Sequence, residues 1–447
     1  MGEFRHRAGC APGHGGAARN AAAVRRAAGR CAAARSHGAG LPETAARALF
    51  PGRVAGPHAL HDRKRRLSSQ NLSREELVGL RLASHRLVSP FSTRRIEQAV
   101  QWSGAVQAQE YTHARWAIGS RFAPAASATD TSIEQAVAKR KVIRTWALRG
   151  TLHLVAAADV RWLLALAAPA LLTRTAASYR DAKLDAAAFR KILPAVRQCL
   201  EGGQQLTRAA LFEELARRRI DTGGHRGGLI LYRAAQTGLI CLGLPSGKQA
   251  TYTLLDEWLP QPAEAPEPSR EDGLKRLAQR YFTSHGPATL ADFTWWSGLA
   301  AGEAKAALEM ALPGLSEALH AGSTVWWSAR TPVPSASPIS TPMVHLLAGF
   351  DEYLLGYTDR TPIIDKAQAG KVMTPNGLFR PALLVDGRVA GTWQAETREG
   401  ALVLSVAPFA PALLSRKAGA ALQEAAQRHA AFNGLALGEI RNGIAPK

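Results

Sequence analysis

Apolar residues recur at helical spacing in the first patterned part of the chain, which begins near residue 71. Ser73 opens it with an S-x-x-E capping box that ends at Glu76. The spacing predicts helices over roughly 73–87, 92–102, 114–121 and 131–141. Two short strand-like segments follow at 142–145 and 152–155 and are predicted to be strands. Several helices followed by a β pair is the element order of a winged helix.

The pattern from residue 206 to residue 254 indicates a second unit of the same kind. Helices are predicted over 206–215 and 229–236, with a glycine-rich turn between them and Gly238 as the stop of the second helix. The apolar segments 239–242 and 250–254 flank Pro245-Ser246-Gly247-Lys248, which has the composition of a hairpin tip.

A third unit and a β-rich end complete the pattern. Helices are predicted over 274–284, 290–299 and 302–312, with a strand over 324–327. Beyond residue 341, strands are predicted over 382–385, 389–393 and 402–406, with a hairpin turn at Asp386-Gly387 and a closing helix over 411–431. We therefore expect a mainly α fold with β (α+β), made of tandem winged-helix units and a C-terminal β-rich segment.

Composition places the boundaries between these units. We expect a disordered Arg/Ala/Gly-rich tail (1–70), a first winged-helix unit (71–185), a second (186–260), a Pro/Glu/Ala-rich linker (261–269), a third (270–335) and a C-terminal α+β segment (336–447). The longest apolar run, residues 162–172, is too short to span a bilayer and is predicted to be a buried helix. No membrane association is expected.

The formal net charge of +21, from 56 Lys+Arg against 35 Asp+Glu, points to a polyanionic partner such as nucleic acid or an anionic membrane. Residues 1–66 carry 13 basic and 3 acidic residues, so they hold +10 and the other 381 residues hold +11. The tail is open to three interpretations: a loose DNA tether, an organellar transit segment, or translation from a start codon placed too far upstream. The remaining +11 fits a surface that follows DNA phosphates, and binding there should weaken as salt rises.

The four cysteines, Cys10, Cys31, Cys199 and Cys241, are scattered and form no C-x-x-C pair. This pattern is typical of a reducing cytoplasm without disulfides. No ligand cluster for a metal stands out, so we expect neither a metal nor another cofactor.

The candidate chemistry centres on Gln107-Ala108-Gln109. Side chains at positions i and i+2 of an extended segment point to the same side, and the preceding Ser103-Gly104 should end the helix and favour that conformation. Each carboxamide both accepts and donates hydrogen bonds, so the pair could hold and orient a water molecule. On spacing alone, two such glutamines are more often surface or capping residues.

Four motifs in the same order resemble the AlkZ/YcaQ family, bacterial winged-helix DNA glycosylases that remove alkylpurines and in some members unhook interstrand crosslinks. These motifs are QAQ at 107–109, LRGTLHLV at 148–155, GPATLADFTWWSGL at 286–299 and FDEYLLGYTDR at 350–360. The resemblance covers roughly residues 72–435 and has no counterpart for the tail. It implies that Gln107 and Gln109 position the hydrolytic water. A glutamine at the second position resembles the AlkZ branch, which acts on bulky adducts and crosslinks.

The implied chemistry suits two neutral amides. A purine alkylated at N7 or N3 carries a positive charge and leaves readily, so the site mainly has to place a water near the anomeric carbon. A carboxylate at position 109 would add general-base power, so Gln109 indicates a more activated substrate or a slower enzyme. No catalytic lysine is evident, and we expect a monofunctional glycosylase that uses water as its nucleophile.

Other candidate residues each have a structural interpretation beside the functional one. Arg149, Thr151 and His153 would share one face of a strand, either as a capped polar wing or with Arg149 on phosphate and His153 near the lesion. Asp351 and Glu352 resemble a glycosidase pair, but salt bridges to Arg360 or Arg380 are the favoured interpretation.

For DNA contact we expect a group at a helix start and a hairpin tip, against the alternative of a solvated basic face: His225, Arg226, Tyr232, Arg233 and Lys248. Trp295 and Trp296 are expected to belong to the core rather than to a base-stacking platform.

The sequence therefore predicts a DNA glycosylase that acts on alkylated purines in double-stranded DNA. We expect a monomer without an obligate protein partner, in the bacterial cytoplasm at the nucleoid. The alternative is a non-catalytic winged-helix DNA-binding protein or transcriptional regulator, because a fold does not establish a function. A hydrolase of nucleosides or glycans using Asp351 and Glu352 is a remote third class.

Overall fold

A computed structural model describes residues 71–124, 128–260, 267–331, 342–410 and 416–443. The predicted tail (1–70) lies outside the described residues, as do Cys10, Cys31 and most of the linker. The described chain mixes helices and strands, which confirms the predicted α+β class. None of the helices described is long and apolar enough to cross a membrane.

The capping box at the start of the described chain is present. Helix α3 (Arg74–Ser84) begins with Ser73 Oγ accepting from the Glu76 N–H, while the Glu76 carboxylate accepts from the Ser73 N–H. The apolar face of α3 packs on the third unit, because Leu77 and Leu80 lie in one cluster with Val325 and Trp327. The helix thus belongs in space to a unit that begins some 200 residues later in the chain.

The first unit continues with six elements that surround the candidate glutamines. They are α4 (Ile96–Ser103), β1 (Val106–Gln107), α5 (Tyr111–Gly119), α6 (Asp130–Ala138), β2 (Val142–Trp146) and β3 (Leu152–Ala156). Strand β3 lies between β1 and β2, and the short 3-10 turn η2 (Leu148–Gly150) joins β2 to β3. The predicted buried helix follows as α7 (Val160–Asp181).

The second unit has the same order of helix, strand, helix, helix, strand and strand. Its elements are α8 (Ala186–Leu200), β4 (Leu206–Thr207), α9 (Arg208–Arg217), α10 (Arg226–Gln236), β5 (Ile240–Leu242) and β6 (Thr251–Leu254). The short α11 (Leu255–Trp258) closes it. Because β2 pairs with β5, the two units share one sheet of order β1-β3-β2-β5-β6-β4. The two end strands of this sheet, β1 and β4, therefore occupy equivalent positions: each follows the first helix of its unit in the order given above.

The third unit repeats the order again. It comprises α12 (Arg270–Ser284), α13 (Leu290–Ser297), α14 (Ala301–Ala311), the 3-10 turn η4 (Leu312–Gly314), β7 (Leu315–His320) and β8 (Ser323–Ser328). Ala288 forms an antiparallel bridge with Trp326. In the order of elements, this bridge takes the position that β1 and β4 have in the other two units. Strand β7 is absent from the sequence prediction because residues 315–320 mix apolar and polar side chains without strict alternation, and only Ala318 among them is buried.

The C-terminal segment is a five-stranded sheet of order β13-β12-β11-β10-β9 with helix α17 (Arg416–Phe432) packed on it. Its strands are β9 (Val344–Leu347), β10 (Ala382–Val385), β11 (Arg388–Arg398), β12 (Ala401–Pro408) and β13 (Ala436–Asn442). The turn at Asp386-Gly387 has two positive φ angles, 49° and 78°, as the hairpin prediction requires. Two short helices, α15 (Glu352–Leu355) and α16 (Lys366–Val372), lie between β9 and β10.

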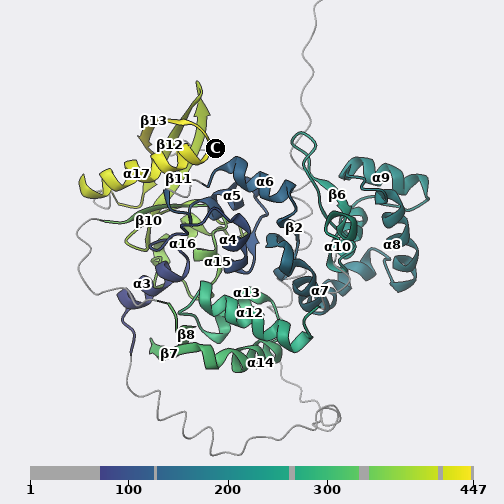
Figure 1. Cartoon of the computed structure of the whole chain (residues 1–447), viewed down its shortest axis with the longest axis horizontal. Helices are drawn as coiled ribbons and strands as arrows, with labels where there is room; N and C mark the ends of the chain where they lie inside the picture. The colour runs from purple at the N-terminus through teal and green to yellow at the C-terminus, as the bar shows by residue number, and fades with distance from the viewer. Residues whose placement is uncertain (1–70, 125–127, 261–266, 332–341, 411–415, 444–447) are drawn as a thin grey trace, which may run out of the picture.

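The second unit projects to one side of the molecule, whereas the first and third units and the C-terminal segment form a single body (Figure 1). One apolar cluster joins α7, the third unit and α15, with Trp296, Tyr281 and Tyr353 at its centre. A second joins α4, α5 and α6 to the C-terminal sheet. The end strand β1 thus lies where these parts meet.

Candidate active site

Gln107 lies on β1, directly opposite His153 of β3. This pairing confirms that the backbone is extended at Gln107, and side chains of opposite residues project from the same face. Gln107 is 6% exposed, and none of the hydrogen bonds among the described residues involves its carboxamide. The side chain is thus enclosed but not used to hold the fold.

A buried carboxylate anchors the backbone of Gln107. The Gln107 N–H donates to Oε1 of Glu352 at 3.0 Å, and the Trp296 indole N–H donates to Oε2 of the same carboxylate at 2.9 Å. His285 Nε2 lies 3.5 Å from that Oε2. Glu352 connects the glutamine strand to α13 and to the end of α12, two consecutive helices that are far from β1 in sequence.

The charge of Glu352 is stabilised by its neighbours. Burial raises the pKa of this carboxyl, but contact with His285 and the positive charge of Arg149 outweigh burial and lower the pKa to about 2. Burial keeps the pKa of His285 below its usual value despite the nearby carboxylate. Glu352 is therefore ionised at neutral pH and accepts hydrogen bonds through both oxygens.

A glycine makes the turn into β1 possible. Gly104 caps α4 with φ of 77°, in the left-handed region that favours glycine, and a Cβ there would lie 3.2 Å from the Trp296 ring. The predicted helix break at Ser103-Gly104 is confirmed. Trp296 therefore fixes both ends of this turn, through its ring and through Glu352.

Gln109 is half-buried, and its side chain forms a hydrogen bond with the backbone of β3. Its side-chain oxygen accepts from the Leu152 N–H at 3.3 Å, and the facing backbone group is a donor, so the oxygen must be the atom that points inward. None of the hydrogen bonds among the described residues involves its amide NH₂ group. Gln109 therefore presents a donor, not an acceptor.

His153 is neutral and has a free acceptor nitrogen. Its Nδ1 lies 2.8 Å from the Thr151 carbonyl oxygen and so carries the proton, which leaves Nε2 as a buried lone pair without a partner among the described residues. Burial and the charge of Arg149 lower the pKa of His153 to about 4. The Thr151 hydroxyl donates weakly to the Leu148 carbonyl at 3.4 Å and has a structural contact only.

Arg149 departs from the strand on which the sequence analysis placed it. It lies in the turn η2 with φ of 56°, and its guanidinium donates to the Trp296 carbonyl oxygen. The other terminal nitrogen, Nη2, is buried without a hydrogen bond to described residues. Because the guanidinium turns toward α13, Arg149 does not share a strand face with Thr151 and His153.

Asp351 forms a structural ion pair, as predicted, but its partner is Arg121 and neither Arg360 nor Arg380. Arg121 donates to its two oxygens at 2.8 and 3.0 Å, and the carboxylate is fully buried. Arg360 and Arg380 instead donate to backbone carbonyls. The salt-bridge interpretation is right and its partners are wrong, because Arg121 is more than 200 residues away in sequence.

The two tryptophans of the third unit differ. Trp296 is fully buried, as expected, whereas Trp295 is 47% exposed and donates to the Leu355 carbonyl at 3.3 Å. The core interpretation is therefore wrong for Trp295. Adjacent positions on a helix point about 100° apart, so only one of the two can face the core.

The predicted DNA-contact group divides into exposed and enclosed residues. His225 and Lys248 are exposed. Arg226 pairs with Asp221 at 3.1 Å, and the Arg233 guanidinium lies over the rings of Tyr179 and Phe189.

Tyr232 is only 4% exposed and packs against Gly150, where a Cβ would meet its hydroxyl. Tyr232 is therefore a core residue and cannot reach DNA. The helical period of α10 turns this residue inward, whereas the sequence analysis judged it only by its type.

His285 and Arg121 are parts of the site that were not predicted from the sequence. Neither belongs to a motif with a spacing signal, and both contact Glu352 or Asp351 across long sequence separations. Also not predicted were three consecutive exposed basic residues, Lys139, Arg140 and Lys141, at the turn between α6 and β2. A charge-run search would have found that group. No metal-binding cluster of His, Cys, Asp or Glu occurs in the described ranges.

Comparisons with known proteins show the family of this chain. A curated relative named interstrand DNA cross-link repair glycosylase, from Streptomyces sahachiroi, is 27% identical over 315 residues, which cover 68% of this chain and 82% of the relative. The solved structure of Streptomyces sahachiroi DNA glycosylase AlkZ matches with a TM-score of 0.69 at 23% identity, over 84% of this chain and all of that one. The family model for AlkZ-like DNA glycosylases matches residues 100–432, and the chain belongs to that family of enzymes.

Proposed function

We propose that this DNA glycosylase hydrolyses the N-glycosidic bond of purines alkylated at N7 or N3, with Gln107 and Gln109 positioning the water. The observation that carries the proposal is that the Gln107 backbone is anchored by Glu352 while its carboxamide takes part in no hydrogen bond among the described residues. A side chain held in place but unused by the fold is suited to bind something else. An anchored backbone also limits the motion that would misplace a water.

The two glutamines have different parts in the proposal. Gln109 is fixed through its oxygen, so its NH₂ group donates to the oxygen of the water. Gln107 then accepts a water proton through its own oxygen. Together the two contacts aim a remaining lone pair of the water at the anomeric carbon.

His153 supports this orientation of Gln107. Its Nε2 can only accept, because the proton is on Nδ1 and burial keeps the ring neutral. In the proposal the Gln107 NH₂ group donates to this nitrogen, and the Gln107 oxygen is thereby turned toward the water. His153 is a positioning residue in this scheme and does not touch the substrate.

Neutral amides suffice because the substrate supplies the activation. An N7- or N3-alkylated purine is cationic and leaves as a neutral base while the sugar gains oxocarbenium character. The ionised Glu352 contributes a fixed negative charge behind Gln107, which favours that developing positive charge. Water is the nucleophile, so the product is an abasic site and the enzyme is monofunctional.

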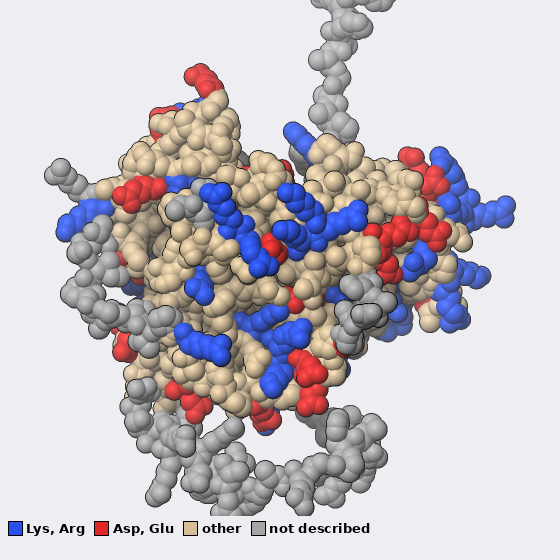
Figure 2. Space-filling model, viewed as in Figure 1, with Lys and Arg blue, Asp and Glu red and all other residues tan. Residues whose placement is uncertain are grey.

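Exposed basic groups of the first two units are proposed to bind the DNA phosphates. Lys and Arg side chains gather over α5, α6 and β2 (Figure 2). Lys139–Lys141 lie at the turn between α6 and β2. His225 and Lys248 extend the surface over the second unit. We propose that a monomer acts on duplex DNA at the nucleoid, without an obligate protein partner.

The name of the curated relative favours bulky substrates. An interstrand crosslink made by alkylation of two purines at N7 contains the same kind of activated glycosidic bond, so the water geometry proposed above would serve for it as well. We therefore include crosslinked purines in the substrate class.

The decisive experiment uses a duplex with a single N7-methylguanine under single-turnover conditions. We expect released base and an abasic site with the wild-type chain, and loss of both with Gln107→Ala and Gln109→Ala. A duplex with a nitrogen-mustard crosslink forms a second arm. Binding without base release in both arms would favour the regulator alternative.

A further inference from the structure

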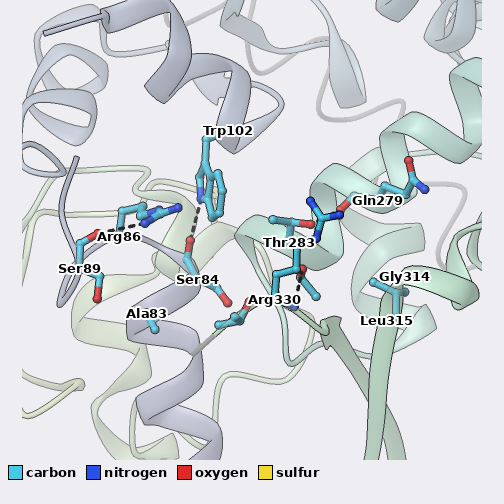
Figure 3. Close-up of a pocket in the computed structure, with 12 residues that line it drawn as sticks. Ala83, Ser84, Arg86, Ser89, Trp102, Gln279, Thr283, Gly314, Leu315 and Arg330 are labelled. Atoms are coloured by element: carbon cyan, nitrogen blue, oxygen red, sulfur yellow. Dashed lines mark hydrogen bonds between the residues drawn. The ribbon is translucent and has the colours of Figure 1, made fainter. Parts of the chain in front are cut away.

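A cavity of about 550 Å³ lies outside the glutamine site, between the end of α3, helix α4, helix α12 and the hairpin β7-β8. Its wall includes Ser84, Arg86, Trp102, Thr283 and Arg330, and no Asp or Glu is among the lining residues. Figure 3 shows Arg86 and Arg330 entering it from opposite sides, with Trp102 between them in this view. The volume falls in the range of small-ligand pockets.

Arg86 carries a positive charge without a carboxylate partner among the described residues. It follows α3 with φ of 59°, an unusual conformation for an arginine, and its guanidinium lies 3.9 Å from the centre of a Trp102 ring. Its Nε is buried without a hydrogen bond, and Nη1 makes only a long contact of 3.4 Å to the Ser89 carbonyl. A partly buried cation in this state gains from an added anion.

Two further side chains in the wall, Ser84 and Arg330, can donate hydrogen bonds to a ligand. Ser84 is 1% exposed, and its hydroxyl has no hydrogen bond within the described structure, although its carbonyl accepts from the Trp102 indole at 2.8 Å. The Arg330 side chain is exposed and pairs with no carboxylate in the part of the chain described. Two cations and a buried hydroxyl donor form a complementary environment for an oxyanion.

We propose that this cavity binds the phosphate group of a nucleotide between Arg86 and Arg330, with the Ser84 hydroxyl as a third donor. Arginine suits this ligand because its planar fork donates to two phosphate oxygens at once. The cavity exceeds what a phosphate ion fills, so a sugar or base has room beside it. The nucleotide can be one unit of a DNA strand or a free mononucleotide, and the phosphate chemistry is the same.

The test pairs Arg330→Gln with Arg398→Gln, a matched loss of one exposed charge on β11, away from the cavity. Binding of an undamaged duplex is measured by fluorescence anisotropy from 50 to 300 mM salt, and binding of AMP and of inorganic phosphate by calorimetry. If the ligand is DNA, Arg330→Gln weakens duplex binding about 3- to 10-fold and lowers the salt slope by about 1.

If the ligand is a free nucleotide, AMP binds the wild-type chain and Arg330→Gln abolishes that binding while duplex affinity stays. Ser84→Ala, which keeps both charges, should weaken the same interaction less. Equal behaviour of Arg330→Gln, Arg398→Gln and wild type toward duplex, AMP and phosphate would overturn the proposal. Because undamaged DNA is used, the result does not depend on the glycosylase chemistry proposed above.

Discussion

The first two units share one element order but use the same strand position for different purposes. Gln107 is the second residue of β1 and pairs with His153, and Thr207 is the second residue of β4 and pairs with Thr251. The Thr207 hydroxyl accepts from the Ala210 N–H at 3.3 Å and caps α9. The Gln107 side chain caps nothing.

The spacing between strand and helix explains this difference. In the second unit α9 begins at the residue after β4, so Thr207 is at once strand end and helix cap. In the first unit residues 108–110 separate β1 from α5, whose cap residue Glu110 makes no side-chain cap bond. The third unit follows the second, since Thr289 after the Ala288 bridge caps α13. The polar side chain at this position caps a helix in the second and third units and has no such structural contact in the first.

The largest effect is expected from Gln107→Ala. Removal of the carboxamide leaves the water without its acceptor, so the single-turnover rate of N7-methylguanine release should fall at least about 100-fold. The Tm should change little, because the side chain holds nothing else. A large drop in Tm together with the rate would mean that Gln107 is structural like Thr207.

Next in size is Glu352→Gln. The neutral amide cannot accept from both the Gln107 N–H and the Trp296 indole, so we expect a rate about 10-fold lower and a stability loss of about 2 kcal/mol. DNA affinity should stay constant. Asp351→Asn is the matched control, because it breaks the buried Arg121–Asp351 ion pair at the adjacent residue and leaves the contact with Gln107 intact. Equal rate losses in both variants would contradict a positioning role for Glu352.

Acid should destabilise the first unit and the C-terminal segment more than the second unit. Burial lowers the pKa of His153, His345 and His429 to about 4, against about 6.5 when unfolded. Their contribution is complete above pH 6.5 and is lost as pH falls toward 4, because the unfolded chain binds more protons there. At these pKa values the loss is about 2 kcal/mol for each histidine between pH 7 and pH 5, measured by urea unfolding.

The second unit has no buried histidine, since its one histidine, His225, is exposed. Hydrogen exchange at pH 5 against pH 7, corrected for intrinsic rates, should therefore show lost protection in β3, β9 and α17 before α8–α10. His345→Gln should flatten the pH dependence of stability. Uniform loss across both regions would argue against this assignment.

The smallest effect is expected from Thr207→Ala. Loss of the α9 cap should cost about 1 kcal/mol of stability, seen as a lower Tm. The rate of base release at saturating enzyme should be unchanged. A rate loss like that of Gln107→Ala would show that the second unit also contributes to chemistry.

Much of the fold was predictable because local signals agree with the tertiary structure. The capping box at Ser73, the stop at Gly104 and the turn at Asp386-Gly387 each satisfy backbone geometry within a few residues. Strand β13 was missed because it pairs in parallel with β12 and joins a sheet edge, with little burial to mark it. Tyr232 was misassigned because residue type was given more weight than helical phase.

The sequence by itself determined the element order of the three units, their α+β class and the extended backbone at Gln107, since capping, turns and periodicity act over short distances. Only the tertiary structure decided which partners surround the pair. Glu352 lies 245 residues from Gln107, and Arg121 lies 230 from Asp351. Such contacts arise from the packing of whole elements, and no local spacing encodes them.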